Sequence, residues 1–157
     1  MARELHEKHK FLVEIIGGRV ASASFAKCSE LSVAAAKIEY WEGGSDIPQK
    51  TAGRLTYKDV TLERGTSSSL DFANWFKMVS DARQGIASST GFGRGEVLPI
   101  FKANATILQL DRDNTTMREW SLEGAFPLEY VAGEWDNETD AVVIEKLTLT
   151  YDKFYTT

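Results

Sequence analysis

Residues 68–85 read SSLDFANWFKMVSDARQG, and this stretch decides the fold class. Ser68 followed by Asp71 resembles a capping box in which Asp replaces the usual Glu, and Gly85 supplies a stop signal. Between these signals, apolar side chains recur at the spacing of an amphipathic helix, at Phe72, Trp75, Phe76, Val79 and Ala82. The sequence therefore predicts one helix, and its apolar face is large enough to cover one side of a sheet.

The rest of the chain carries β signals on both sides of this helix. Runs rich in apolar, β-branched and aromatic residues predict strands at 11–16, 20–25, 37–42 and 55–62 before it, and at 100–110, 117–123, 128–131 and 141–151 after it. Gly17 and Gly18 indicate a hairpin turn between the first two, and the polar residues 111–114 indicate another turn. Because a parallel sheet needs a helix at each crossover, one helix favours a mainly β fold. We expect an antiparallel β-sandwich or barrel with one flanking α-helix.

Length and composition indicate a single folded domain. The chain has 157 residues, of which 43% are hydrophobic and 26% charged, as in average globular proteins. We expect one domain over residues 1–157, with a flexible N-terminus at 1–10. Residues 84–98 are rich in Gly and Ser and lack an apolar period, which predicts a mobile surface loop.

Charge and terminal composition restrict the class of protein. The net charge is −5, which argues against a protein that wraps nucleic acid, because that requires clustered Lys and Arg. The first ten residues are charged and resemble no signal peptide, and apolar runs elsewhere are far shorter than a membrane span. We therefore expect synthesis in the cytoplasm and no membrane anchor.

Residue types suited to catalysis or metal binding are scarce. His6 and His9 are the only histidines, and no third metal ligand accompanies them. Without a histidine in the body of the domain, a Ser-His-Asp or Cys-His arrangement has no base, and Cys28 has no activating partner. We therefore expect that the protein is not an enzyme and that it has no catalytic or metal site and binds no cofactor.

Several segments, taken in order, resemble the tail tube family of contractile phages. In the first half they are FLVEI (11–15), ASFAKCSELS (23–32), IEYWEGG (38–44) and VTLERG (60–65), followed by the helix that carries Trp75. In the second half they are ILQLD (107–111), WSLEGAFPLEY (120–130) and VIEKLTL (143–149). The resemblance covers nearly the whole chain except the first ten residues and the loop at 84–98.

This resemblance implies a non-enzymatic structural subunit of an inner tail tube. Six such subunits form a ring by joining their sheets around a channel, and rings stack head to tail into a tube. Ring closure would pair the sheet edges of neighbours, which removes exposed edges. The implied partners are other copies of the chain and the sheath, baseplate and terminator proteins. DNA or an effector protein would pass through the lumen without specific binding. The implied location is a virion tail or a phage-tail-like particle.

On that basis, the segment from Gly43 to Gly53 is the candidate for contacts between rings. It is longer than a hairpin turn requires and has charges of both signs on or beside it, at Glu42, Asp46, Lys50 and Arg54.

Three alternatives stay open at this level. The chain could form the tube of an extracellular or type VI-like protein-delivery system, or a tube terminator or hub protein that forms a single ring. It could also belong to a different class, a small-molecule-binding β-barrel, which would be a monomer with an apolar pocket.

Overall fold

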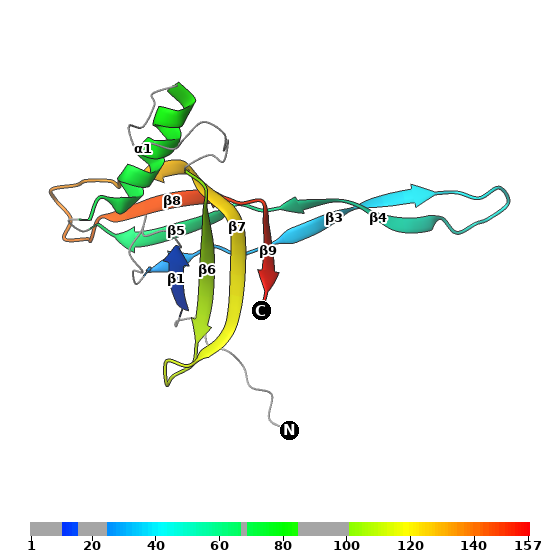
Figure 1. Ribbon diagram of the computed structural model, residues 1–157, viewed down its shortest axis with the longest axis horizontal. Coiled ribbons are helices and arrows are strands. Elements are labelled where there is room, and N and C mark those ends of the chain that lie inside the picture. The colour runs from blue at the N-terminus through cyan, green and yellow to red at the C-terminus, as the bar shows by residue number, and fades with distance from the viewer. Residues whose placement is uncertain (1–10, 16–24, 67–68, 85–100) are drawn as a thin grey trace, which may run out of the picture.

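The computed structural model describes residues 11–15, 25–66, 69–84 and 101–157. In these ranges the chain forms nine strands and one α-helix (Figure 1). The elements are β1 (Phe11–Ile15), β2 (Lys27–Cys28), β3 (Val33–Tyr40), β4 (Gln49–Tyr57), β5 (Val60–Gly65), α1 (Asp71–Gln84), β6 (Ala103–Leu110), β7 (Thr116–Val131), β8 (Ile144–Thr150) and β9 (Lys153–Thr156). The predicted mainly β class with one flanking helix is confirmed.

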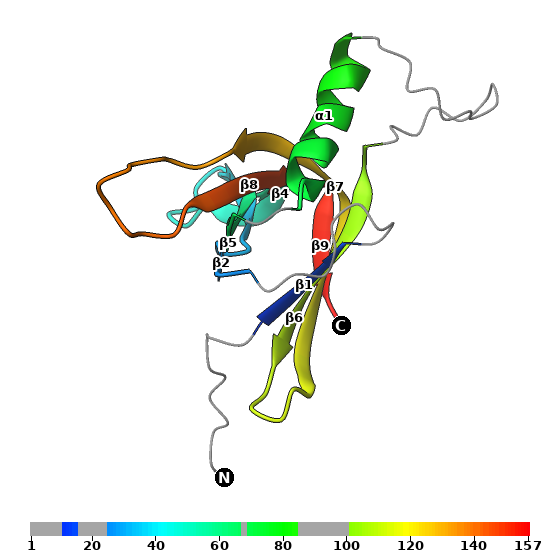
Figure 2. The same ribbon diagram turned by 90° about the vertical axis from the view of Figure 1, so that its left-hand side faces the viewer.

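Seven strands form the body of the molecule. Their order is β1-β6-β7-β8-β5-β2, with β9 also paired to β7, and every pair is antiparallel. The 16-residue β7 pairs with β6 and β9 through its first half and with β8 through its second half. It therefore belongs to two layers, and Figure 2 shows it passing from one to the other.

The change of direction in β7 has a local cause. Gly124 has a φ of 66°, and a Cβ at this position would collide with the Asp152 carboxylate. The β7 ladder to β8 also shifts register between Pro127 and Glu129, as at a β-bulge. These irregularities bend the strand, so one continuous chain segment closes the sandwich.

The core lies between the two layers and under α1. Phe72 and Trp75 are buried on the helix, and the Trp75 indole Nε1 donates a hydrogen bond of 2.7 Å to the Phe101 carbonyl. The Phe72 ring stacks on Phe25 at 5.7 Å between centroids. The buried apolar side chains are Val13, Ile15, Phe25, Val60, Leu62, Phe72, Trp75, Ala105, Ile107, Leu122, Ala125, Leu147, Leu149 and Tyr151.

A buried ionic cluster attaches α1 to the sheet. The Arg64 guanidinium on β5 donates to Glu145 Oε1 on β8 at 2.5 Å and pairs with both carboxylate oxygens of Asp71, the first residue of α1. Tyr130 on β7 donates its hydroxyl to Glu145 Oε2 at 3.3 Å, and the Arg64 carbon Cζ lies 3.7 Å from the centre of the Phe72 ring. The cluster thus joins three strands to the helix.

These contacts shift the pKa of both partners in the expected directions. Burial alone would raise the pKa of Asp71, but hydrogen bonds from Arg64 and Ser69 outweigh it and hold that pKa below its ordinary value. Burial alone would lower the pKa of Arg64, and the hydrogen bonds to Asp71 and Glu145 raise it instead. Both groups therefore stay charged in the folded protein over the neutral pH range.

The helix prediction is correct for the buried Phe72 and Trp75, whereas Phe76 and Val79 are only partly buried and Ala82 is exposed. It differs at the start of the helix. Because α1 begins at Asp71 and Asn74 N donates to Leu70 O, Asp71 is the first helical residue and not the third. The Asp71 side chain accepts from Phe72 N and pairs with Arg64, so the expected capping box is wrong in position. Ser68 and Gly85 lie outside the described residues. Gln84, expected in the loop at 84–98, is the last helical residue.

Two predicted strands have different bounds. The strand expected at 55–62 is divided, because Lys58 and Asp59 separate β4 from β5. The strands expected at 117–123 and 128–131 form the single β7, while β2 and β9 were not predicted. The described partner of β1 is β6, and the return strand expected at 20–25 lies mostly outside the described residues, as do the N-terminal segment 1–10 and residues 85–98.

Candidate assembly site

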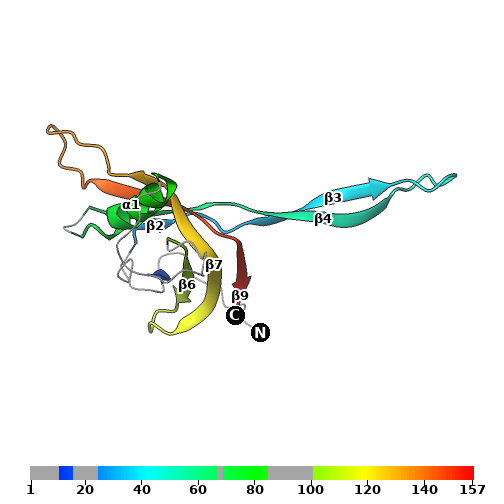
Figure 3. The same ribbon diagram turned by 45° about the horizontal axis from the view of Figure 1, so that its top comes forward.

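Strands β3 and β4 form a two-stranded arm that leaves the body. They pair with each other in a separate sheet and with no other strand among the described residues. Figures 1 and 3 show the arm extending far beyond the body along the longest axis of the molecule. Since an isolated two-stranded ribbon is only marginally stable in water, an arm of this length indicates a surface that another chain covers.

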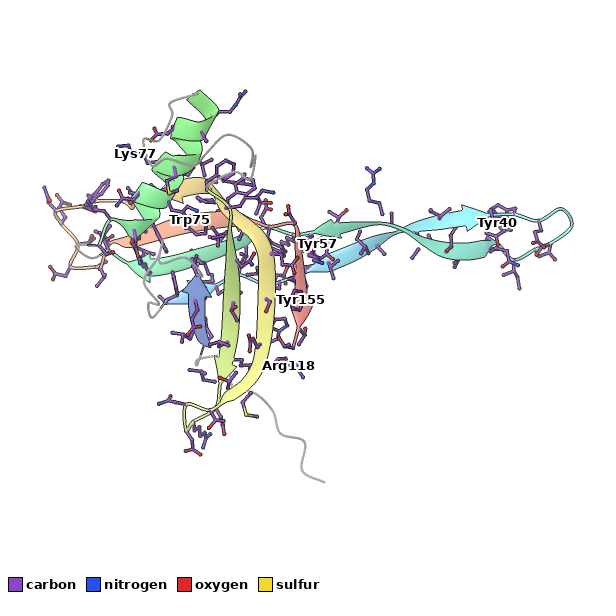
Figure 4. All side chains as sticks on the ribbon, in the orientation of Figure 1. Tyr40, Tyr57, Trp75, Lys77, Arg118 and Tyr155 are labelled. Carbon is purple, nitrogen blue, oxygen red and sulfur yellow. The ribbon has the colours of Figure 1, made fainter. Side chains whose placement is uncertain are left out.

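Large apolar side chains are exposed along the arm. Every residue of β3 is exposed, and Tyr40 stands far out near the tip in Figure 4. Half or more of the side chain is open to solvent at Ile38, Tyr40, Trp41, Ile47 and Leu55, and nearly as much at Val33. Single exposed apolar residues are common on monomers, but a row of them on one projecting element is typical of an interaction surface.

The root of the arm is held firmly on the body. Tyr151 donates its hydroxyl to the Lys58 carbonyl at 2.6 Å, and Lys58 N donates to the Ser32 carbonyl at 3.0 Å. Tyr57, at the end of β4, packs edge-on against Tyr151 and Phe154 with ring centroids 6.0 and 5.6 Å apart. The arm therefore leaves the body in a defined direction, which an assembly element requires.

The four charged residues predicted for ring contacts all lie on the arm. Glu42 and Asp46 are in the connection between β3 and β4, whereas Lys50 and Arg54 are on β4, and all four are exposed. β4 begins at Gln49, so the connection is shorter than the predicted loop at 43–53. Among the described residues none of the four forms an ion pair with another of the four, and the ion pair on β3 is Lys37–Glu39 at 2.9 Å.

Reasoning from charge missed the apolar residues of the arm. The signal was present as alternation, because Ile38 and Tyr40 share one face of β3 while Lys37 and Glu39 share the other. Only the structure shows that neither face of this strand is covered by the body.

The body offers open sheet edges. Within the described residues, β1 pairs only with β6 and β9 pairs only with β7, so each has one unpaired side. Open edges present unpaired N–H and C=O groups, which readily accept a strand from another chain.

Neither a metal-binding cluster nor an activated cysteine is found in the described residues. No group of three His, Cys, Asp or Glu residues could hold a metal there, and His6 and His9 lie outside that part. Burial raises the pKa of Cys28 to about 11, so its thiol stays protonated and is a poor nucleophile. A shallow groove of about 240 Å³ lies between α1 and β7, below the usual size of a small-molecule site.

In the described part of the chain, no helix combines the length and apolar character that crossing a bilayer requires.

The described residues form a β-sandwich with one helix, open sheet edges and a long exposed arm, an architecture suited to assembly with other chains. The sequence matches the family described as T4-like virus tail tube protein gp19 over residues 7–155. The chain belongs to this family of tail tube proteins. A search of curated proteins found no match.

Solved structures share the fold at low sequence identity. A chain of the anti-feeding prophage baseplate has a TM-score of 0.75 at 20% identity, covering 100% of this chain and 97% of that one. A chain from the sheath-tube complex of an extracellular contractile injection system, PVC, has a TM-score of 0.75 at 18% identity, and the match covers 99% of this chain and 93% of that one. A chain of the anti-feeding prophage cap has a TM-score of 0.77 at 18% identity, and the match covers 100% of this chain and 93% of that one.

Proposed function

We propose that six copies of this chain close into a ring and that rings stack through the β3–β4 arm to form the inner tube of a contractile tail. The observation that carries this proposal is the arm itself, which projects from the body with its apolar residues uncovered. A head-to-tail contact of this kind repeats without closing, so it extends a tube from ring to ring. The family membership supports the same assembly.

Ring closure uses the open edges of the body. Pairing the β1 edge of one copy with the β9 edge of the next would continue the sheet from subunit to subunit, and closure would leave neither of these two edges unpaired. This arrangement also accounts for the open sides of both β1 and β9 on one subunit.

Location and cargo follow from this role. The chain acts as one domain over residues 1–157, without catalytic activity, is made in the bacterial cytoplasm and is incorporated into a virion tail or a phage-tail-like particle. Sheath, baseplate and terminator proteins are its other partners. DNA or an effector protein passes through the lumen without specific binding, which the net charge of −5 favours in the case of DNA because like charges repel.

A tube terminator is the second candidate. The likeness to the prophage cap chain is as good as the likeness to the sheath-tube chain, with TM-scores of 0.77 and 0.75. A terminator forms one ring and does not polymerise, so particle length separates the two roles.

Negative-stain electron microscopy of the purified chain, together with its sedimentation velocity, tests the proposal. Stacked tubes with six-fold end views are expected. Single rings at every concentration would favour the terminator, and a monomer at every concentration would contradict both roles.

Charge reversal on the arm tests the predicted ring contacts. Asp46→Lys combined with Lys50→Glu keeps the net charge and is expected to weaken stacking and leave single rings. Unchanged tube length in this variant, measured beside the unmodified chain, would remove these residues from the contact.

A further inference from the structure

The outer half of the arm has two chemically different faces. Its register pairs Lys37 with Ala52, Ile38 with Thr51, Glu39 with Lys50 and Tyr40 with Gln49. Since side chains alternate along a strand, Lys37, Glu39 and Lys50 share one face, which we name the charged arm face. Ile38, Tyr40, Thr51 and Gln49 share the other, which we name the uncharged arm face.

The two faces differ in what it would cost to cover them with another chain. On the charged arm face, Lys37 and Glu39 pair at 2.9 Å in a solvated position, so this face needs no partner. On the uncharged arm face, Ile38 and Tyr40 are 50% and 51% exposed and carry no charge. Covering this face removes apolar surface from water and strands no charge, whereas covering the charged arm face would desolvate three charges.

On the uncharged arm face, Ile38 packs closely on the backbone of the arm itself. Gly53 lies in the bulge beside it, and a Cβ there would come within 3.1 Å of both the Ala36 carbonyl oxygen and Ile38 Cδ1. The Ile38 side chain therefore lies over the β4 backbone. A glycine inside a strand commonly marks such a close approach.

The opposite end of the molecule carries a matching apolar surface. The connection between β7 and β8 lies at the far end of the long axis from the arm (Figure 1). Within residues 131–144, Trp135 and Val142 are 69% and 73% exposed, and Val131 and Ile144 are also open. We name this segment the end loop. Two apolar surfaces at opposite ends of one chain suit a head-to-tail contact between copies.

Charge adds direction to this pairing. The acidic residues of the end loop are Glu134, Asp136, Glu138 and Asp140, and the loop has no Lys or Arg. Lys37 and Lys50 lie on the charged arm face, outside the apolar contact, and from there their positive charges can attract the acidic end loop at a distance without being buried.

We propose that the uncharged arm face of one copy packs on the end loop of a second copy, with Ile38 and Tyr40 against Trp135 and Val142. This inference rests on the proposed tube assembly and specifies which faces meet. It gives Lys50 a peripheral place in the contact and assigns most of the affinity to apolar burial.

Two neighbouring substitutions test the face. Ile38→Lys and Glu39→Lys introduce the same side chain at adjacent positions on opposite faces, and both positions are exposed. Ile38→Lys is expected to lower the fraction of chain in stacked tubes at least tenfold, whereas Glu39→Lys is expected to change it less than threefold. Equal effects, or a larger effect of Glu39→Lys, would overturn the assignment. Thermal unfolding of both variants should match the parent chain.

Disulfide trapping tests the receiving surface. In a Cys28→Ser background, Tyr40→Cys is combined with Trp135→Cys or with Val142→Cys, and Lys37→Cys with Trp135→Cys serves as the matched control. The proposal expects a covalent ladder of chains from at least one Tyr40 pair and not from the control. Tubes without a ladder from either Tyr40 pair would overturn the end-loop contact and leave the proposed function intact. A parent chain that never assembles would instead overturn the proposed function.

Discussion

The body and the arm use the same antiparallel ladder and differ in what covers it. Leu62 and Leu147, paired across β5 and β8, are fully buried, whereas Ile38 and Tyr40 on the arm are half exposed. In the body each apolar face meets a second layer or α1. On the arm no second layer exists among the described residues. The body is therefore stabilised by its own layers, whereas the arm presents apolar surface to another chain.

Charged groups show the same division. Arg64 and Glu145 are 5% and 4% exposed and join elements far apart in the chain, whereas Lys37 and Glu39 are two residues apart on one exposed strand. Removing one partner of a buried pair leaves an uncompensated charge, but an exposed pair contributes little to folding. Substitutions at buried residues of the body should thus alter stability, and substitutions on the arm should alter assembly.

The largest expected effect on folding comes from removing the buried Trp75, with the exposed Trp41 on the arm as the control. Trp75→Ala removes a buried ring and leaves the Phe101 carbonyl without its donor, so it should lower the free energy of unfolding by about 3–5 kcal/mol. Trp41→Ala, at a position 62% exposed on the arm, should lower it by less than about 0.5 kcal/mol. Urea unfolding of the full chain at low concentration measures both. Similar losses would erase the distinction between body and arm.

Next in size is the loss of Arg64. Arg64→Ala leaves Asp71 and Glu145 unpaired beneath α1, which should cost about 3 kcal/mol of unfolding free energy. Lys37→Ala, the control on the arm, should cost less than about 1 kcal/mol. If the two variants unfold alike, the buried cluster does not attach the helix as described.

A smaller expected effect is a loss of stability at low pH. The pKa of Asp71 is lowered in the folded state from its ordinary value of 3.8, so its ion pair with Arg64 stabilises the fold above that value and the contribution is lost as the pH falls through the lowered pKa. The free energy of unfolding should therefore fall as the pH is lowered from about 5 through the lowered pKa, and by less in Asp71→Asn than in the parent chain. Glu39→Gln on the arm is the control. A parallel fall in Asp71→Asn and the parent would show that other carboxylates dominate.

The fold class was predictable because its signals are local. Phe72 and Trp75 recur at helical spacing and are both buried, and the runs that became β6 and β8 are apolar enough to identify as strands. The turn at Asp111–Asn114 was also predictable from its polar residues, and Asn114 has a φ of 62° there.

What the sequence could not reveal depends on contacts between distant segments. The strand expected at 55–62 is divided at Lys58, whose carbonyl accepts a hydrogen bond from the hydroxyl of Tyr151, 93 residues away. The pairing of Arg64 with Glu145, 81 residues away, is equally invisible in a local pattern. The charges of the candidate site were found from composition, but its apolar residues were missed because exposure is a property of the assembled layers.

The most direct test of the account removes the arm and keeps the body. Residues 36–54 are replaced by Asn-Gly, which joins the paired residues Ala35 and Leu55 through a two-residue hairpin turn. Sedimentation velocity and electron microscopy then compare this variant with the parent chain, and circular dichroism confirms that the body is folded. The account predicts a folded chain that forms no stacked tubes. Tubes of parental length from the armless chain would contradict it.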